Sequence, residues 1–501
     1  MGDRPPITRY ISFLKFIGDF MGSLISELKR YVKTSVDFDS DNRLWFKAIH
    51  EIYFEHDFKE EAIDNLNDFL SATMDEVRLR CANKYAKEVL KITDIDDFNF
   101  FSIGVLKREM AGDISYFKQR DHSAHSLYNY LLGWYLFENI NIIKDTFAHH
   151  CALRGIDNDH YFMTFFELWP IVSLLHDIGY IFEGSLGPLD TSVQNELIMK
   201  GVELANDYFK HTCWVEIGFS PINEQQIIKL MTGVNEPEIM SRSLLELSDS
   251  LRFLDNLELL RQEINDEMGL SRNLVGKTDY IKTRYGLPGD AFTIWKRHFD
   301  YYGNKLLYKR IISLEKSYEY LLNEGLDPGG ERVLDHGICS GLLLLISSTF
   351  YFRMHVALKN FSPENKYQKT LRNNFLTRTS GYSALHWWRG IVWATAATAI
   401  HNIQQVKFKN IPHKKLKIDE DPLAYLGIIV DILQVWDRTN IRKGAVLKGD
   451  LPIQGIDIDL FKTKTGKVFI NYKNNETSKA IKTDLNNALT GWEKLLIIKP
   501  D

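Results

Sequence analysis

Residues 169–179 read WPIVSLLHDIG, and this stretch decides how the rest of the chain is interpreted. Its first part, Trp169 to Leu174, is largely apolar, which is typical of a buried helix. The glycine at its end can close such a helix in a left-handed turn. His176 and Asp177 therefore stand side by side where a buried helix is expected to end. Burying this pair is costly unless a partner or a metal compensates it, and a cation would compensate the carboxylate and the imidazole together.

Further long apolar stretches predict helices elsewhere in the chain. Because each has the length and composition of a buried helix, we expect a mainly α fold with a helical core. The predicted helices span Asp121–Asn141, Tyr161–Ile178, Ile338–Phe352, Ala384–Val406 and Pro422–Trp436.

Three more histidines and one aspartate stand on or beside these predicted helices. His125 lies near the start of the first helix, His336 opens the helix that begins at Ile338, and His401 comes near the end of the next. Asp431 stands among isoleucine and valine residues in the last helix. An ionised carboxylate is rarely buried without a partner, so this position indicates a bound cation or a charged neighbour.

Together these motifs resemble the HD superfamily of metal-dependent phosphohydrolases, which is named for its adjacent histidine and aspartate. The string His176-Asp177-Ile178-Gly179 matches the commonest form of that motif, and His125-Ser126-Leu127 resembles the superfamily's leading histidine. Members that hold two metals have two further histidines between the pair and a final aspartate. The resemblance implies that Asp177 bridges two divalent cations, whose ligands would be His125, His176, Asp177, His336, His401 and Asp431.

The predicted ligands determine what chemistry the site is expected to perform. Imidazole and carboxylate groups suit manganese, iron, magnesium, cobalt or zinc, and the sequence does not decide among them. Two such cations lower the pKa of a bound water and neutralise charge on a phosphoryl group. Asp177 is thus predicted to be catalytic. His122, on the helical face of His125, is either a proton donor or an ordinary hydrogen-bonded histidine. The candidates for contacts with substrate phosphates are Arg120, Arg389 and Arg438.

The resemblance implies a phosphohydrolase that acts on a nucleotide, either a nucleoside or deoxynucleoside triphosphate or a cyclic nucleotide. Two other functions stay open. Some members of the superfamily hold a pair of irons in the same ligand set and activate dioxygen, so a di-iron oxygenase is one alternative. The other is a regulatory module that senses a nucleotide and passes the signal to a partner.

At 501 residues the chain is too long for one simple core, and we predict three regions. Residues 1–100 form an N-terminal helical region. Residues 101–440 form an HD-type core with a large helical insertion at about 181–330. Residues 441–501 form a small α+β appendage, because apolar residues alternate across a turn near Gly466, which predicts a β-hairpin, and a helix is expected from Ser478 to Leu495.

Composition narrows the expected partners and location. The net charge of -5 gives no general attraction to nucleic acid or to anionic lipid. The four cysteines are far apart without a CxxC pair, which fits a reducing cytoplasm. Charged residues interrupt the apolar stretch from Tyr10 to Val32, so we expect no membrane anchor there. That stretch predicts an amphipathic helix, which packs on the body or on a second subunit of a homo-oligomer.

Overall fold

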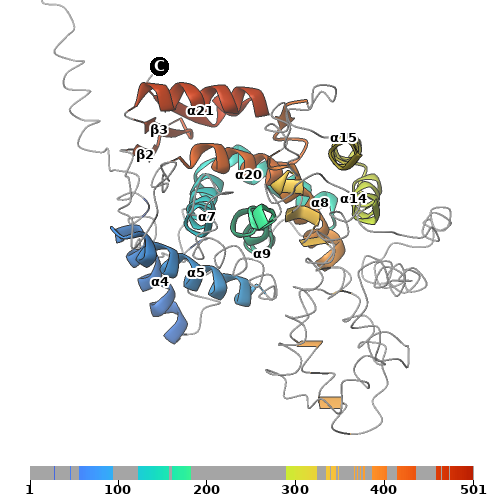
Figure 1. Ribbon diagram of the computed structural model, residues 1–501, viewed down its shortest axis with the longest axis horizontal. Coiled ribbons are helices and arrows are strands. Elements are labelled where there is room, and N and C mark those ends of the chain that lie inside the picture. Colours follow the sequence, from blue (N-terminus) through green and yellow to red (C-terminus); the bar gives the residue numbers. More distant parts are fainter. Residues whose placement is uncertain are drawn as a thin grey trace, which may run out of the picture. The chain divides into compact units, whose positions relative to one another are not determined.

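The structure is a computed structural model. It describes residues 56–93, 122–156, 161–181, 289–323, 386–402, 414–435 and 458–499 apart from 464 and 473, with Leu28, Phe46 and shorter pieces between 335 and 377. Helices dominate these residues, as Figure 1 shows, so the predicted mainly α fold is confirmed. None of the described helices is both long enough and apolar enough to cross a membrane. Most of the predicted N-terminal helix and residues 182–288 of the predicted insertion lie outside the described residues.

The chain divides into two compact units, which are described separately. The first unit takes its residues from Met1–Tyr85, Gln119–Asp145 and Ile429–Asp501. The second unit takes its residues from Ala86–Lys118 and Thr146–Ile428. Three helices contribute residues to both units: α5 (Asp75–Ile92), α8 (Asn141–Leu153) and α20 (Pro422–Leu433).

The core of the first unit forms around α7 (His122–Asn139), the first of the predicted apolar helices. Side chains all around α7 are buried, as expected of a helix that is apolar on every face. Aromatic side chains surround it. The ring of Phe69, from α4 (His56–Ser71), lies 4.6 Å from that of Tyr128, and the ring of Phe46 lies 5.9 Å from that of Trp134.

The C-terminal residues of the first unit form a small α+β arrangement, as predicted. Strands β2 (Ile458–Lys462) and β3 (Val468–Tyr472) pair antiparallel as the expected hairpin, and Gly466 has a φ of 78° in its turn. Helix α21 (Asn475–Ala488) packs on β3 and on β5 (Leu496–Lys499). The hydroxyl of Tyr472 donates to the carbonyl of Leu433 at 2.7 Å, which ties the sheet to the end of α20.

One boundary in this region was predicted wrongly. The helix expected from Ser478 to Leu495 starts earlier, because Asn474 caps it, and it ends at Ala488. The residues that follow form β4 (Leu489–Thr490), the short 3-10 helix η11 (Trp492–Lys494) and β5. The C-cap residue Leu489 is extended, Gly491 has a φ of 84° before η11, and β5 pairs in parallel with β3.

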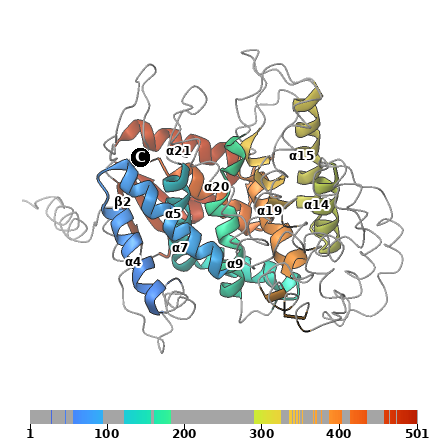
Figure 2. The same ribbon diagram turned by 60° about the horizontal axis from the view of Figure 1, so that its bottom comes forward.

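The second unit is built on α9 (Tyr161–Leu174), which packs against α19 (Val392–Ile400). Figure 2 shows these two helices beside each other. A five-residue π-helix, η10 (Trp387–Ile391), runs directly into α19. On another side of α19 lies α14 (Gly289–Tyr301), where the indole nitrogen of Trp295 donates to Thr395 at 3.1 Å.

Two further pieces complete this unit. Helix α15 (Lys305–Asn323) packs along α14, as Figure 1 shows, and the turn between them contains Gly303 with a φ of 69°. Both helices lie in or next to the predicted helical insertion. The two-residue strand β1 (Leu416–Lys417) precedes α20, which ends at Leu433 and is therefore shorter than predicted.

Candidate metal centre

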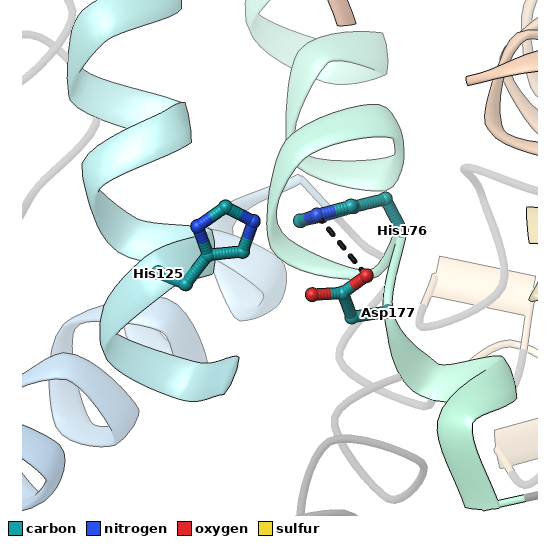
Figure 3. Close-up of side chains that lie close together, drawn as sticks. All are labelled: His125, His176 and Asp177. Carbon is teal, nitrogen blue, oxygen red and sulfur yellow. Dashed lines mark ion pairs between the residues drawn. The ribbon is translucent and has the colours of Figure 1, made fainter. Parts of the chain in front are cut away.

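The His-Asp pair lies immediately after α9, in the turn that leads into the short 3-10 helix η3 (Ile178–Ile181). His176 and Asp177 are only 2% and 5% exposed. The Nδ1 of His176 donates to the carbonyl of Ser173 at 2.8 Å, which leaves Nε2 as the nitrogen with a lone pair. That Nε2 lies 3.3 Å from Oδ1 of Asp177, and Figure 3 draws this contact as a dashed line.

Asp177 also lies among two histidines from distant parts of the sequence. One ligand atom from each of Asp177, His336 and His401 can be chosen so that all lie within 4.8 Å of one another. We call these three residues the Asp177 group. All three are buried, and Nε2 of His336 is 3.6 Å from Oδ1 of Asp177. The ring of His401 lies 4.9 Å from that of His176. These buried residues could hold a metal ion, in a manner compatible with an HD-type site.

His401 is held in the same way as His176. It directly follows α19, and its Nδ1 donates to the carbonyl of Thr398 at 2.6 Å. A carbonyl can only accept, so this bond fixes the proton on Nδ1 and leaves the lone pair on Nε2. Backbone carbonyls orient metal-binding histidines in this manner in many proteins.

Two polar side chains next to the ligands connect the segments that carry them. Oδ1 of Asp335 accepts from the backbone N–H of Ile338 at 2.8 Å and so caps the helical residues that begin at His336. Its Oδ2 accepts from the side-chain amide of Asn402 at 2.8 Å. The same amide nitrogen is 3.4 Å from Nδ1 of His336. The bond between Asp335 and Asn402 therefore fixes His336 relative to His401.

The glycine of the HDIG string has a different purpose from the one predicted. Gly179 is not among the described glycines with positive φ, so it does not make a left-handed turn. A Cβ added there would lie 2.1 Å from the carbonyl oxygen of His336. Its backbone N–H donates to Oγ of Ser340 at 2.7 Å. Glycine is needed because the two backbones approach each other closely.

In the first unit, His125 lies on α7 and meets the end of α20. Its Nε2 is 2.9 Å from Oδ1 of Asp431 and 3.1 Å from the side-chain amide of Asn129. Its Nδ1 contacts the side-chain amide of Gln434. We call His125 and Asp431 the His125 pair. The structure thus brings two predicted ligands together here, while the other four lie in the second unit.

Four further residues were predicted to belong to the site, and the structure describes two of them. His122 is buried at the start of α7, three residues before His125. Nη1 of Arg389 donates to the carbonyl of Gly155 at 3.1 Å. Twelve residues of helix separate Arg389 from His401, which is about 18 Å at 1.5 Å per residue. Arg120 and Arg438 lie outside the described residues. The roles proposed for these four residues stay predictions.

Three polar residues at these clusters had been given no role from the sequence. They are Asn129, Asp335 and Asn402, and each is buried. Their positions in the sequence could have identified them. Asp335 and Asn402 are next to two predicted ligands in the chain, and Asn129 comes one helical turn after a third.

No family model, curated protein or solved structure matches the chain. The likeness to an HD-type site therefore depends on the residues and their geometry. What the described residues show is a mainly helical chain with a buried group of histidines and aspartate that could hold a metal ion.

Proposed function

We propose that this chain is an HD-type metal-dependent phosphohydrolase that cleaves a nucleotide. The observation that carries the proposal is the Asp177 group, in which buried imidazole and carboxylate atoms from three separate segments come within 4.8 Å of one another. Such a donor set suits divalent transition metals or magnesium. The nucleotide follows from the resemblance of the motifs to the HD superfamily.

The donor atoms fit a cation. With its proton on Nδ1, the neutral ring of His176 presents the lone pair of Nε2, which lies 3.3 Å from an oxygen of Asp177. In this state two acceptors face each other, and in a buried site their repulsion is poorly screened. A cation between them would turn the repulsion into two attractions.

We further propose that the His125 pair completes this centre. In the resembling superfamily the leading histidine and the final aspartate belong to the same ligand set as the His-Asp pair. Here Nε2 of His125 and Oδ1 of Asp431 lie 2.9 Å apart, as two ligands of one cation would require. His125 would share a cation with His176 and Asp177, the three residues that Figure 3 labels.

The proposed roles follow from the resemblance to the HD superfamily. Asp177 would be shared between two cations, with His336 and His401 on one of them and His125 and His176 on the other. The bound metals would supply an activated water and would neutralise the charge of the phosphoryl group. His122, buried three residues before His125 on α7, would donate a proton to the leaving oxygen.

The test is a turnover assay with purified protein in manganese, iron or magnesium. Nucleoside triphosphates, deoxynucleoside triphosphates and cyclic nucleotides would each be offered, and release of phosphate or nucleotide products would be measured. We expect His176→Ala and Asp177→Ala to lose turnover, since each removes a predicted ligand. His149→Ala is the matched control, because His149 is exposed on α8 and should leave turnover unchanged.

Three outcomes would overturn the proposal. Full turnover in both ligand variants would show that the reaction does not use this site. Nucleotide binding without turnover in metal-replete protein would favour the sensing module. Oxygen consumption that requires iron, with no phosphate product, would favour the di-iron oxygenase.

A further inference from the structure

A second buried polar cluster lies in the second unit, around Arg154 at the end of α8. Arg154 is 1% exposed, and its Nη1 donates to the carbonyl of His150 at 2.9 Å. Among the residues that the structure describes, Nε and Nη2 of Arg154 have no hydrogen-bonding partner. A buried guanidinium with two unused donor nitrogens is unusual, because buried polar groups normally find partners.

The two unused nitrogens are the ones that matter for binding. Nε and Nη2 form one edge of the guanidinium plane, and their N–H groups point in parallel. This edge is the fork that matches two oxygens of a phosphate or a carboxylate. The bond from Nη1 to His150 uses a different nitrogen and leaves the fork of Arg154 intact.

Aromatic rings hold the guanidinium in position. Its Cζ lies 3.8 Å from the ring centre of Trp393 on α19 and 5.3 Å from that of Tyr302 in the turn after α14. Cation–π contact of this kind stabilises a desolvated arginine and restricts its orientation. The fork of Arg154 is therefore kept in place before any ligand arrives.

Two more buried donors belong to residues near Arg154. The hydroxyl of Tyr302 is buried and, within the described part of the chain, has no hydrogen-bonding partner, and the same holds for Nε of Arg389. Burial raises the pKa of Tyr302, whereas the positive charges of Arg154 and Arg389 lower it, so both cations act on this hydroxyl. Arg389 also bonds the carbonyl of Gly155, the residue next to Arg154. We call Arg154, Tyr302 and Arg389 the arginine cluster.

The charges around the arginine cluster do not cancel. Burial and the charge of Arg154 lower the pKa of His150 to about 4, and the same two causes lower that of His298, so both rings are neutral near pH 7. Burial raises the pKa of Asp421 to about 6, which leaves it ionised near pH 7, and it accepts from the indole of Trp393 at 3.1 Å. Among the described residues, Asp421 is the one carboxylate that affects the pKa of Arg154, and it stands against the two guanidinium groups of Arg154 and Arg389.

We propose that the arginine cluster is a second, metal-independent site that binds an oxyanion, a phosphate or carboxylate group of a small molecule. The fork of Arg154 would take two oxygens, and the hydroxyl of Tyr302 and Nε of Arg389 would donate to the same group. The donor atoms themselves are buried, so the oxyanion would be enclosed, with the partly exposed residues Arg389 and Tyr302 between it and solvent. About 18 Å of helix separates Arg389 from His401, which makes this site distinct from the Asp177 group. Arg389 thereby gains a role other than the substrate contact predicted from the sequence.

The test uses the whole 501-residue chain in EDTA, which removes metal. Binding of inorganic phosphate is measured by isothermal titration calorimetry at constant ionic strength. Acetate and chloride serve as parallel arms, and whichever of phosphate and acetate binds more tightly identifies the class of oxyanion. We expect one saturable site, and we expect Tyr302→Phe and Arg389→Met each to weaken binding at least about tenfold, as loss of a hydrogen bond to a charged group does. Circular dichroism and thermal midpoints would confirm that both variants fold.

Two control variants show whether the bound phosphate occupies the arginine cluster. Lys309→Met removes one positive charge from an exposed position on α15 and should leave the affinity unchanged. His176→Ala should also bind phosphate normally, which keeps this result separate from the outcome of the turnover assay. Absence of saturable binding, equal loss in Lys309→Met, or unchanged affinity in both cluster variants would overturn the proposal. So would a crystal structure in high phosphate with only water at the Arg154 fork.

Discussion

At the scale of single residues, the backbone determines which nitrogen of a ligand histidine is available. The Nδ1 atoms of His176 and His401 each donate to a carbonyl three residues earlier, and both rings therefore present Nε2. His125 instead directs its Nε2 toward Asp431, 2.9 Å from Oδ1. Two buried histidines that each follow a helix are thus oriented by backbone carbonyls, as metal-binding histidines commonly are.

The buried ionisable residues at Trp393 lead to a prediction about pH. The pKa of His150 falls from 6.5 to about 4 on folding, so between these values the unfolded chain binds more protons and stability rises with pH. The pKa of Asp421 rises from 3.8 to about 6, so over that range the folded chain binds more protons and stability falls with pH. Each pKa shift changes the free energy of unfolding by about 3 kcal/mol across its pH range. In the natural chain the two changes have opposite signs.

Replacing either His150 or Asp421 should reveal how the other residue changes stability with pH. In Asp421→Asn, the thermal midpoint should increase more steeply from pH 4 to 6.5 than in the natural chain. In His150→Gln it should increase less, or decrease, from pH 4 to 6. Thermal midpoints across this range would be compared among the three proteins. Parallel curves for all three would contradict the assignment, since other titrating groups affect each protein equally.

At the scale of elements, the site depends on how the ends of helices are joined. Asp335 caps the helical residues that begin at His336 and also accepts from Asn402, the residue after His401. We predict that Asp335→Ala lowers stability by about 1 kcal/mol through the lost cap. It should also weaken metal binding by about 10- to 100-fold, because His336 and His401 lose their connection. Metal affinity would be measured by titration with manganese.

Asn474→Ala provides the matched control for this variant. Asn474 caps α21 by accepting from the N–H groups of Glu476 and Thr477. Its replacement should cost a similar amount of stability and leave metal affinity unchanged. Equal metal affinity in Asp335→Ala and Asn474→Ala would show that Asp335 acts only as a helix cap.

The close approach at Gly179 gives a second prediction at this scale. In Gly179→Ala the new methyl group would lie 2.1 Å from the His336 carbonyl, so the two segments must separate. We expect a clear fall in thermal midpoint and loss of manganese binding. Gly303→Ala is the comparison: its φ of 69° is strained for alanine, but no atom lies within 4 Å of the added Cβ. That variant should lose only about 1–2 kcal/mol and keep its metal, and metal binding retained in Gly179→Ala would contradict the prediction.

The elements that sequence predicted well are those with one dominant local signal. Unbroken apolar runs predicted α7 and α9, and alternation predicted the hairpin of β2 and β3. The segment at β5 was assigned to a helix because its apolar residues suit either state, and only its pairing with β3 decides between them. The five-residue π-helix η10 was likewise not foreseen, since it depends on packing in the second unit.

At the scale of the whole molecule, the order of motifs predicted the candidate ligands, whereas contacts between distant residues were not predictable. Asp335 and Asn402 are 67 residues apart, and no local pattern links them. The same limit applies to the arginine cluster, whose members come from separate segments of the second unit. Residue type and order indicated the candidate ligands, but the residues that contact and orient them became visible only in the folded chain.

The central claim is the proposal that six histidine and aspartate side chains hold two cations. Manganese bound per chain, measured by elemental analysis after saturation and desalting of metal-free protein, tests it most directly. We predict two ions in the natural chain and in His149→Ala, about one in His125→Ala and in His336→Ala, and none in Asp177→Ala. No bound metal in the natural chain, or two ions retained in Asp177→Ala, would contradict the account.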